Sequence, residues 1–372
     1  MKKQIVEILT NGFESDVRVY KEAVFMKQLG YDVTILAWDR EQNSSLPNKE
    51  IRDGLNVIRF RYISPAGRTR NPFKKIHAYF CYARECKKYI RTNQFDYIHC
   101  NDNSGAFVGC YAKTKKIPMV VDMHEFFEYG SRIRRYFMRK MNIYFFNHSI
   151  AALYENSAYL ESPYKRVNTI LYPLRNYPDS GMVKYSKKTK SSVFRIGFHG
   201  WIRSRMVEFV ALFEAIKDMK NVRVDLNGRG PGMELAKQIS ARYSNVFVNG
   251  PFDGTKDLTK LYSNTDLLFC GYDPDDPNYQ GDAEIVKFYE AIVTGTPMLM
   301  TESLGMGEKV KKNGWGVTCD TRDSEQIKNA ILRIMNDKVF WEECSSRELI
   351  SAPNYRWEEA VKVLEKIYPK IN

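Results

Sequence analysis

The stretch GDAEIVKFYEAIVTGTP, residues 281–297, decides how the second half of this chain is interpreted. Its apolar residues recur at the spacing of one helix face, which predicts an amphipathic helix. Gly295 interrupts that pattern two residues before Pro297, as is usual where a helix ends. We therefore expect a loop followed by a helix that packs one face against a core.

Four charged residues of this stretch are candidate ligand-binding groups. Asp282 and Glu284 are expected at the start of the helix, where free backbone N–H groups and the helix dipole favour an anion such as a diphosphate. Lys287 and Glu290 are three residues apart and so share one face. An ordinary helix with capping acids and an ion pair has the same pattern, and this stretch alone does not separate the two interpretations.

The length and composition set the limits of the interpretation. A chain of 372 residues is long enough for two domains with separate cores. A content of 44% hydrophobic and 27% charged residues is typical of a soluble globular protein. The start MKKQIVEILTNGF predicts a first strand, and neither a signal peptide nor a membrane anchor. Seven scattered cysteines without Cys-x-x-Cys spacing favour reduced thiols, a cytoplasmic location and no structural zinc.

The charge balance predicts an anionic partner, since 57 basic and 44 acidic residues give a net charge of +13. The positive charge is concentrated at residues 68–91 and 132–140, where aromatic residues are interleaved with it. Such helices suit an anionic membrane, which predicts peripheral contact with the inner membrane face. A solvated helix face over a normal core fits the same residues. We find no RNA-recognition motif and expect no nucleic-acid partner.

Strands and helices alternate along the first half, which predicts a doubly wound parallel sheet. Strands are expected at residues 4–9, 31–37, 57–62, 95–100, 118–122 and 149–153, and helices at 17–29, 72–91 and 132–146. Ligands of such sheets bind beyond the carboxyl ends of the strands. The polar groups that follow these strands are therefore expected on one rim: Asn11-Gly12, Asn101-Asp102-Asn103 and Asp122-Met123-His124-Glu125.

The second half repeats this alternation. Residues 179–192, DSGMVKYSKKTKSS, are polar and basic and are predicted to be an interdomain linker. Strands are expected at 194–198, 222–227, 246–248, 266–270 and 298–300, and further helices at 207–219, from 233 and at 258–262. We expect an α/β protein of two doubly wound, Rossmann-like halves that face each other across a cleft.

The residues of the second half resemble the donor-binding domain of retaining glycosyltransferases of the GT-B fold, family 4 type (glycosyl transferases group 1). The resemblance covers nearly the whole chain, and the order and spacing of several segments support it: FHG, LNGRGPG, VNGPFD, DLTKLYSNTDLLF, KFYEAIVTGTP and WGV. It implies an acceptor-binding domain at residues 1–178 and a donor-binding domain at 193–355. The ending NYRWEEAVKVLEKIY is similar to the family's closing helix, which implies that residues 356–372 pack back on the first domain.

The resemblance also implies roles for residues of the donor-binding domain. The spacing Asp282-x7-Glu290 matches the family's Glu-x7-Glu element, which implies that Glu290 holds the ribose hydroxyls and Asp282 the transferred sugar. Glu284 is close enough to compete with Asp282 for the sugar. Arg203 and Arg205 lie where the family neutralises the leaving diphosphate, and which of the two does more stays open.

Further positions match the family's pattern in both domains. Lys287 is expected to reach the same phosphates, and Gly228 and Gly250 mark loops whose backbone would hold the base. His124 matches a histidine near the reacting sugar, although a lone histidine at a strand end is as often structural. Gly12 lies where a glycine lets the backbone approach the diphosphate. The acceptor-side candidates are Asp16, Arg18, Asn101 and Asp102.

The implied reaction is metal-independent, retaining transfer from a nucleoside-diphosphate sugar, with no cofactor. His124, Arg203, Arg205 and Glu290 are the implied catalytic residues. Uridine is the base most often found in the family, and guanosine or adenosine donors fit the same motifs. The implied acceptor is a glycan or lipid-linked glycan of surface-polysaccharide synthesis.

Three alternatives stay open at this point. Asp273-Pro274-Asp275 could be the Asp-x-Asp metal site of the other large glycosyltransferase fold, although it lies late in the chain. A sugar-nucleotide 2-epimerase shares the two-domain fold and would act on the donor alone. A non-catalytic partner subunit of a true transferase would also share the fold.

Overall fold

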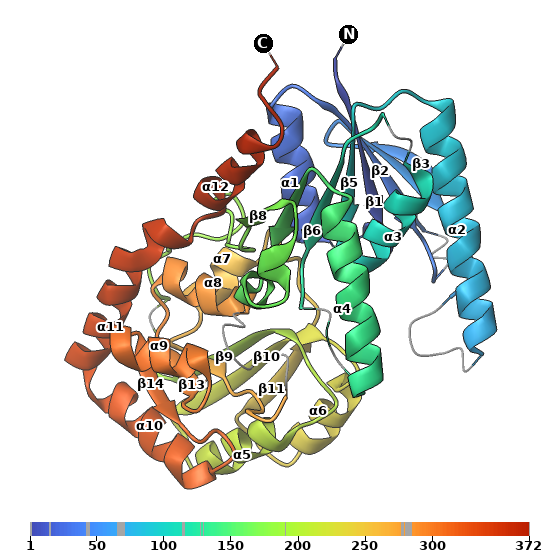
Figure 1. Cartoon of the computed structure of the whole chain (residues 1–372). Helices are drawn as coiled ribbons and strands as arrows, with labels where there is room; N and C mark the ends of the chain where they lie inside the picture. Colours follow the sequence, from blue (N-terminus) through green and yellow to red (C-terminus); the bar gives the residue numbers. More distant parts are fainter. Residues whose placement is uncertain are drawn as a thin grey trace. The chain divides into compact units, whose positions relative to one another are not determined.

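The computed structural model describes residues 2–14, 16–41, 45–64, 71–113, 116–126, 128, 130–189, 191–276, 279 and 285–371 (Figure 1). The chain divides into two compact units. The first unit comprises Met1–Arg175 and Val361–Asn372, and the second comprises Asn176–Ala360. Each unit is built around its own parallel sheet, which confirms the predicted α/β class with two Rossmann-like domains.

The first unit contains an eight-stranded sheet with the order β3-β4-β2-β1-β5-β6-β7-β8. Neighbouring strands are parallel, except that β3 pairs antiparallel with β4. The strands are β1 (Gln4–Leu9), β2 (Asp32–Trp38), β3 (Lys49–Arg52), β4 (Leu55–Phe60), β5 (Tyr97–Asn101), β6 (Met119–Met123), β7 (Ala151–Tyr154) and β8 (Ile170–Pro173).

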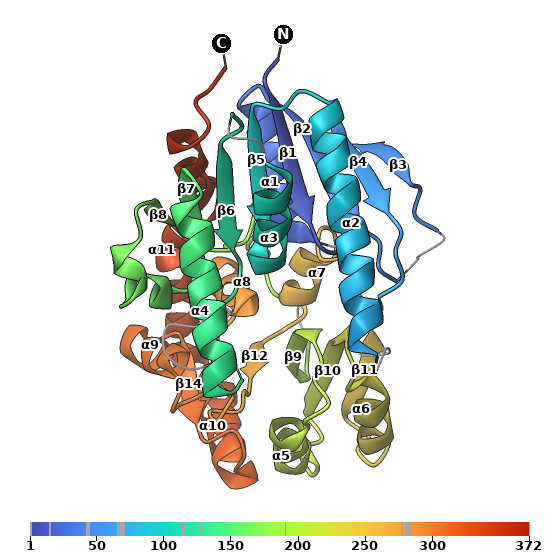
Figure 2. The same cartoon turned by 45° about the vertical axis from the view of Figure 1, so that its right-hand side comes forward.

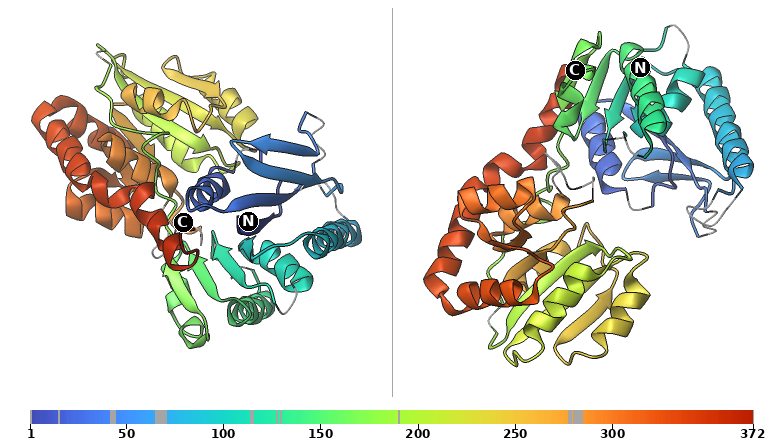
Figure 3. Two further views of the ribbon diagram at one scale, coloured as in Figure 1. Left: turned by 90° about the horizontal axis from the view of Figure 1, so that it is seen from above. Right: turned by 60° about the horizontal axis from the view of Figure 1, so that its bottom comes forward.

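Helices cover both faces of this sheet. Figures 1 and 2 show α2, α3 and α4 side by side on one face and α1 on the other, and Figure 3 shows the same separation from above. With both faces covered, the central strands are nearly continuous apolar runs. The helices are α1 (Val17–Gln28), α2 (Pro72–Thr92), α3 (Asp102–Ala112) and α4 (Arg132–Asn147), with short 3-10 turns η1 (Ser157–Leu160) and η2 (Tyr164–Arg166).

The C-terminal segment completes the first unit. It contains the 3-10 turn η5 (Val361–Lys366), which contacts α1, and Tyr368, which is fully buried. The Tyr368 ring packs edge-on against Tyr31 and Tyr97, at centroid distances of 5.9 and 5.2 Å. Its hydroxyl lies 2.8 Å from Nδ1 of His99 in β5. The chain therefore returns to the first sheet after it has formed the second.

The second unit contains a six-stranded parallel sheet with the order β11-β10-β9-β12-β13-β14. Its strands are β9 (Phe194–Trp201), β10 (Val222–Arg229), β11 (Val246–Gly250), β12 (Leu267–Cys270), β13 (Met298–Thr301) and β14 (Gly316–Cys319). Its helices are α5 (Val207–Ile216), α6 (Met233–Ser240), α7 (Leu258–Ser263), α8 (Val286–Thr294), α9 (Gly305–Asn313), α10 (Ser324–Asn336), α11 (Lys338–Ser351) and α12 (Trp357–Ala360), with the 3-10 turn η4 (Ala352–Tyr355). Helix α8 contacts α7 and α11, whereas α10 contacts α5.

The described part of the predicted linker, residues 179–189, packs on the second unit. Val183 is buried in the second core. Nζ of Lys188 donates to the carbonyl of Tyr262 at 2.9 Å and to Oγ1 of Thr296 at 2.5 Å. The backbone N–H of Thr189 donates to the carbonyl of Ser263 at 2.9 Å. This segment therefore contributes to the fold of the second unit.

Among the described residues, no helix combines the length and the apolar character that crossing a bilayer requires.

Candidate active site

Helix α8 presents the first group of candidate residues. The helix ends at Gly295, whose left-handed φ of 59° allows the terminal N–H groups to reach the last carbonyls. Glu290 is buried, and its Oε2 accepts a 2.8 Å hydrogen bond from the hydroxyl of Tyr262 in α7. Burial, reinforced by the nearby Glu290 carboxylate, raises the pKa of Tyr262 well above its usual value. Tyr262 thus remains a hydrogen-bond donor that fixes the orientation of Glu290.

Lys287 lies one turn before Glu290 in an aromatic setting. Its Nζ is 3.8 Å from the ring centroid of Phe198 and 5.5 Å from that of Tyr272. Burial lowers the pKa of Lys287 to about 8, and the neighbouring Cys270 and Glu290 offset this shift only in part. A second anion close to Nζ would therefore stabilise the ammonium form.

The two predicted sugar-binding acids, Asp282 and Glu284, lie outside the described residues. Helix α8 begins at Val286, after an N-terminal cap residue, Ile285, that makes no side-chain capping bond. The predicted roles of both acids therefore stay predictions.

Arg203 and Arg205 follow β9 and are held by the loop after β12. Arg203 pairs through NH1 with Asp276, and its guanidinium lies 4.6 Å from the ring centroid of Tyr279. Arg205 pairs through NH1 with Asp273. About half of each arginine side chain is exposed, at 44% and 51%. Both guanidinium groups are thus accessible to an anion while they are held near the loop that leads to α8.

The Asp-x-Asp motif takes part in these ion pairs. Asp273 pairs with Arg205, and Oδ2 of Asp275 lies 3.4 Å from NH1 of Arg322. Both carboxylates therefore already have cationic side chains as partners.

His199, at the end of β9, is a polar residue to which the sequence interpretation gave no role. Its Nδ1 accepts from the Asn227 amide at 3.1 Å, and its Nε2 lies 3.0 Å from Oγ1 of Thr265. Burial, and then the charge of Lys287, lower the pKa of His199 to about 3. The ring is therefore neutral, and it packs edge-on against Tyr262 at 5.0 Å. His199 therefore supports Tyr262, the tyrosine whose hydroxyl donates to Glu290.

The two glycines predicted to hold the base lie in different surroundings. A Cβ at Gly228 would lie 1.8 Å from the carbonyl oxygen of Gly200, because β9 and β10 approach closely at this pair. Gly250 has a left-handed φ of 92°, and a Cβ there would meet no atom within 4 Å. Gly228 is thus required by strand packing, whereas the space beside Gly250 is open.

In the first unit, Arg18 of α1 is the centre of a buried charge network. Its NH2 donates to both oxygens of Asp122, at 2.8 and 3.0 Å, and its NH1 donates to Glu155 at 2.7 Å. Its Nε lies 2.9 Å from Oε1 of Glu22. The side chain of Arg18 is 5% exposed. Arg18, predicted to face the acceptor, thus has internal carboxylates as its partners.

His124 lies next to this network, after β6. Its Nε2 is 3.0 Å from Oδ2 of Asp122, and its backbone N–H donates to Oδ1 of Asp102 at 3.0 Å. Desolvation lowers the pKa of His124, but the carboxylates of Asp102 and Asp122 outweigh it and raise the pKa to about 10. His124 is therefore an imidazolium at neutral pH. The structure brings together the predicted residues His124, Asp102 and, through Asp122, Arg18.

The remaining first-unit candidates have structural partners. Asn101 is buried, and its amide donates to Glu7 at 3.3 Å. Asp16 caps α1 by accepting from the N–H of Val19 at 3.2 Å. The carbonyl of Gly12 accepts from Nε of Arg59 at 2.7 Å, which holds the loop after β1.

Glu22, Asp122 and His124 also fulfil the distance requirement for a metal site, since one ligand atom of each lies within 4.8 Å of the others. Arg18 contacts both carboxylates, so a cation already lies at this cluster. The donor set therefore fits the guanidinium better than a metal ion.

Comparisons with known proteins agree with this architecture. Residues 16–159 match the family model Glycosyltransferase Family 4, and residues 193–337 match Glycosyl transferases group 1. No curated protein matches the chain in a sequence search.

Three solved structures illustrate the similarity of fold. Sucrose-phosphate synthase from Thermosynechococcus elongatus has 15% identity and a TM-score of 0.76, with 99% of this chain and 98% of that chain covered. HepE from Anabaena, in complex with UDP and glucose, has 13% identity and a TM-score of 0.70, with 99% and 100% covered. A UDP-N-acetylglucosamine 2-epimerase has 12% identity and a TM-score of 0.64, with 99% and 96% covered.

Proposed function

The chain belongs to the glycosyltransferases of the GT-B fold, family 4 type, and we propose that it transfers a sugar from a UDP-sugar to an acceptor hydroxyl with retention of configuration. The observation that carries the proposal is the buried Glu290, held by Tyr262 one turn after Lys287. A carboxylate fixed in this way can accept hydrogen bonds from both ribose hydroxyls. The choice of uridine is supported by HepE, a protein of similar fold in complex with UDP and glucose.

The reaction needs cations because negative charge develops on the leaving diphosphate while positive charge develops on the sugar. Arg203, Arg205 and Lys287 supply this charge. The two arginines exchange their aspartate partners for phosphate oxygens, which a guanidinium can bind through two nitrogens. The acceptor oxygen bonds to the anomeric carbon on the face from which the diphosphate leaves, and its proton passes to the leaving oxygen.

His124 has a separate role in this proposal. As an imidazolium fixed by Asp122, it can donate a hydrogen bond to a sugar hydroxyl but cannot act as a base near neutral pH. Arg18 then acts as a positioning residue, since it binds both oxygens of the same Asp122.

A donor screen that measures the released nucleoside diphosphate tests the proposal. Turnover with a UDP-sugar and an acceptor is expected for the native chain and is expected to be lost in Glu290→Gln. Glu234→Gln, at a carboxylate with 80% exposure on α6, is the matched control and should keep full turnover. Turnover retained by a folded Glu290→Gln protein contradicts the proposed site.

The epimerase alternative is supported by the similar fold of the 2-epimerase. An epimerase would convert the donor without an acceptor and without release of UDP. Measuring the epimerised donor and the released UDP in the absence of acceptor distinguishes the two activities. No conversion of any donor, with or without acceptor, would favour a non-catalytic partner subunit.

For the acceptor we propose a lipid-linked glycan, as in surface-polysaccharide synthesis, bound at an anionic membrane surface. The support is helix α4, in which only Asn142, Phe145 and Phe146 are buried. Apolar side chains are exposed between its arginines and lysine, which is the composition that favours a membrane interface. The exposed apolar residues of α4 are Ile133, Tyr136, Phe137, Met141 and Tyr144.

A further inference from the structure

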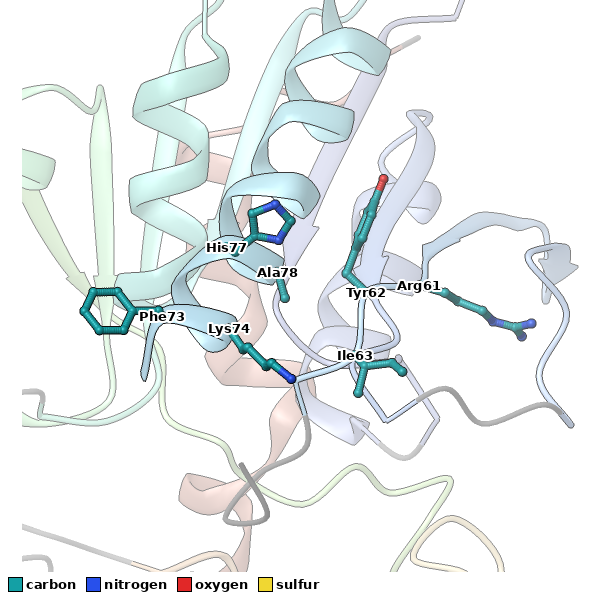
Figure 4. Close-up of a pocket in the computed structure, with 7 residues that line it drawn as sticks. All are labelled: Arg61, Tyr62, Ile63, Phe73, Lys74, His77 and Ala78. Atoms are coloured by element: carbon teal, nitrogen blue, oxygen red, sulfur yellow. The ribbon is translucent and has the colours of Figure 1, made fainter. Parts of the chain in front are cut away.

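A groove of about 570 Å³ lies in the first unit between the start of α2 and the segment that follows β4. Figure 4 shows this groove and the side chains around it. Its position beyond the carboxyl end of a parallel strand is where doubly wound sheets bind ligands. The seven lining residues are Arg61, Tyr62, Ile63, Phe73, Lys74, His77 and Ala78.

The walls of the groove are mainly apolar. Tyr62 and Ile63 form one side, and Ala78, which is buried at the edge of the first core, lies on the other. Ile63 is 60% exposed although it is fully apolar. A hydrocarbon chain in the groove would remove this apolar surface from water, which favours binding. The volume also falls in the range of pockets that bind organic ligands and exceeds the needs of a simple ion.

Among the described residues that line the groove, Arg61 and Lys74 are basic and none carries a carboxylate. Lys74 extends from α2 toward Ile63 in Figure 4, and its Nζ makes no hydrogen bond or ion pair with the residues that the structure describes. Arg61 differs, because its Nε donates to Asp39 at 3.0 Å and its guanidinium is directed away from the helix (Figure 4). Of the basic residues described around the groove, Lys74 is therefore the one that is available to a ligand.

We propose that this groove binds a phosphate or diphosphate ester of an apolar alcohol, with the phosphate on Lys74 and the hydrocarbon along Tyr62, Ile63 and Ala78. An amphiphilic anion satisfies both features of the groove, whereas a neutral sugar would leave the apolar wall and the cation unused. The inference rests on the proposed glycosyltransfer, because this ligand would be the lipid phosphate to which the acceptor glycan is attached.

Equilibrium binding of farnesyl phosphate, kept below its micelle concentration, tests the proposal, with farnesol and inorganic phosphate as comparison ligands. The native chain should bind farnesyl phosphate at least about tenfold more tightly than either, since the phosphate and the chain each contribute. Lys74→Glu and Ile63→Asp should each weaken this binding about tenfold or more. Lys88→Glu, an identical charge change at an exposed position further along α2, should leave it unchanged.

Three outcomes would overturn the proposal. Equal binding of inorganic phosphate would reduce the groove to an ion site, and equal binding of farnesol would leave Lys74 without a role. An equal loss in Lys88→Glu would indicate attraction by the net charge alone. UDP binding, measured on the same samples, separates this test from the proposed function: loss of UDP binding contradicts the transferase site and leaves the farnesyl phosphate result standing.

Discussion

The hydroxyl of Tyr262 in α7 donates a 2.8 Å hydrogen bond to the carboxylate of Glu290 in α8, two residues that are 28 positions apart in sequence. Tyr262→Phe removes this bond and leaves the rings of the site in place. A bond to a buried carboxylate contributes about 1.5–3 kcal/mol, so we expect a fall of about tenfold or more in kcat/KM for the UDP-sugar. Steady-state kinetics measure kcat/KM, at a temperature well below the Tm of both proteins. Tyr185→Phe, at an exposed tyrosine of the same unit, is the control. An unchanged kcat/KM would mean that Glu290 does not need this orientation.

The affinity for UDP should decrease as the pH rises through about 8. Burial lowers the pKa of Lys287 to about 8, so the group loses its proton above that pH, and the neutral amine cannot neutralise a diphosphate. Calorimetric titration between pH 7 and pH 9 should show weaker binding at the higher pH, with proton uptake near pH 8 because a bound diphosphate raises the pKa.

Lys287→Arg is the decisive control for this pH dependence, since arginine stays charged throughout the window. Lys188 has to be excluded, because burial lowers its pKa to about 8 as well. If the UDP affinity of Lys287→Arg still fell between pH 7 and pH 9, the titrating group would be a residue other than Lys287.

Chelation should leave sugar transfer unaffected. We propose a metal-independent reaction because Arg203, Arg205 and Lys287 supply the positive charge that the leaving diphosphate needs. Turnover measured with excess EDTA should match turnover without it. If EDTA abolished turnover and Mg²⁺ or Mn²⁺ restored it, a metal ion rather than the arginines would neutralise the diphosphate.

Gly228 and Gly250 should respond differently to substitution by alanine. Gly228→Ala places a Cβ 1.8 Å from the backbone oxygen of Gly200, and should lower the free energy of unfolding by about 3 kcal/mol. Gly250→Ala meets no atom within 4 Å and suffers only from its left-handed φ, a loss of about 1–2 kcal/mol. Urea denaturation followed by circular dichroism compares the two, and equal losses would refute the close approach of β9 and β10.

Helix α4 should contact anionic membranes through its exposed apolar residues. Ile133→Ser combined with Phe137→Ser should reduce co-sedimentation with phosphatidylglycerol vesicles several-fold at low salt, because less apolar surface enters the interface. The control is Val339→Ser combined with Ile350→Ser, two apolar residues of α11 with similar exposure. Equal loss in both proteins, or no binding by the native chain, would contradict the membrane proposal.

Strong local patterns in the sequence were enough to predict most elements. The bounds of β1 were predicted to the residue, and Gly295 ends α8 as expected. Strand β3 was missed because its residues Lys49–Arg52 are mostly polar and lie at the edge of the sheet. Helix α3 was missed because its start looks like a polar strand-end loop. A Cβ at Gly105 in that helix would lie 2.9 Å from the carbonyl of Ile8, so small residues let α3 approach the sheet.

The candidate site was less accessible to sequence interpretation, because its partners are far apart in the chain. Arg18 meets Asp122 and Glu155 across 104 and 137 positions, and no local pattern indicates that its guanidinium points inward. His199 similarly depends on Asn227 and Thr265. Motif spacing could place Glu290 on a helix, but its hydrogen bond from α7 arises only from the tertiary fold.

The position of Tyr368 has a consequence for the order of events during synthesis. Its partner His99 belongs to a cluster with Glu7 and Glu22, and burial raises the pKa of both acids. Tyr368 follows the whole second unit in the chain, so the nascent first unit must wait for the second to be translated before that cluster is sealed. A chain that stalls or is cleaved before residue 361 would lack Tyr368 and expose this buried cluster to chaperones and proteases, so the folding of the first unit is tied to the synthesis of the second.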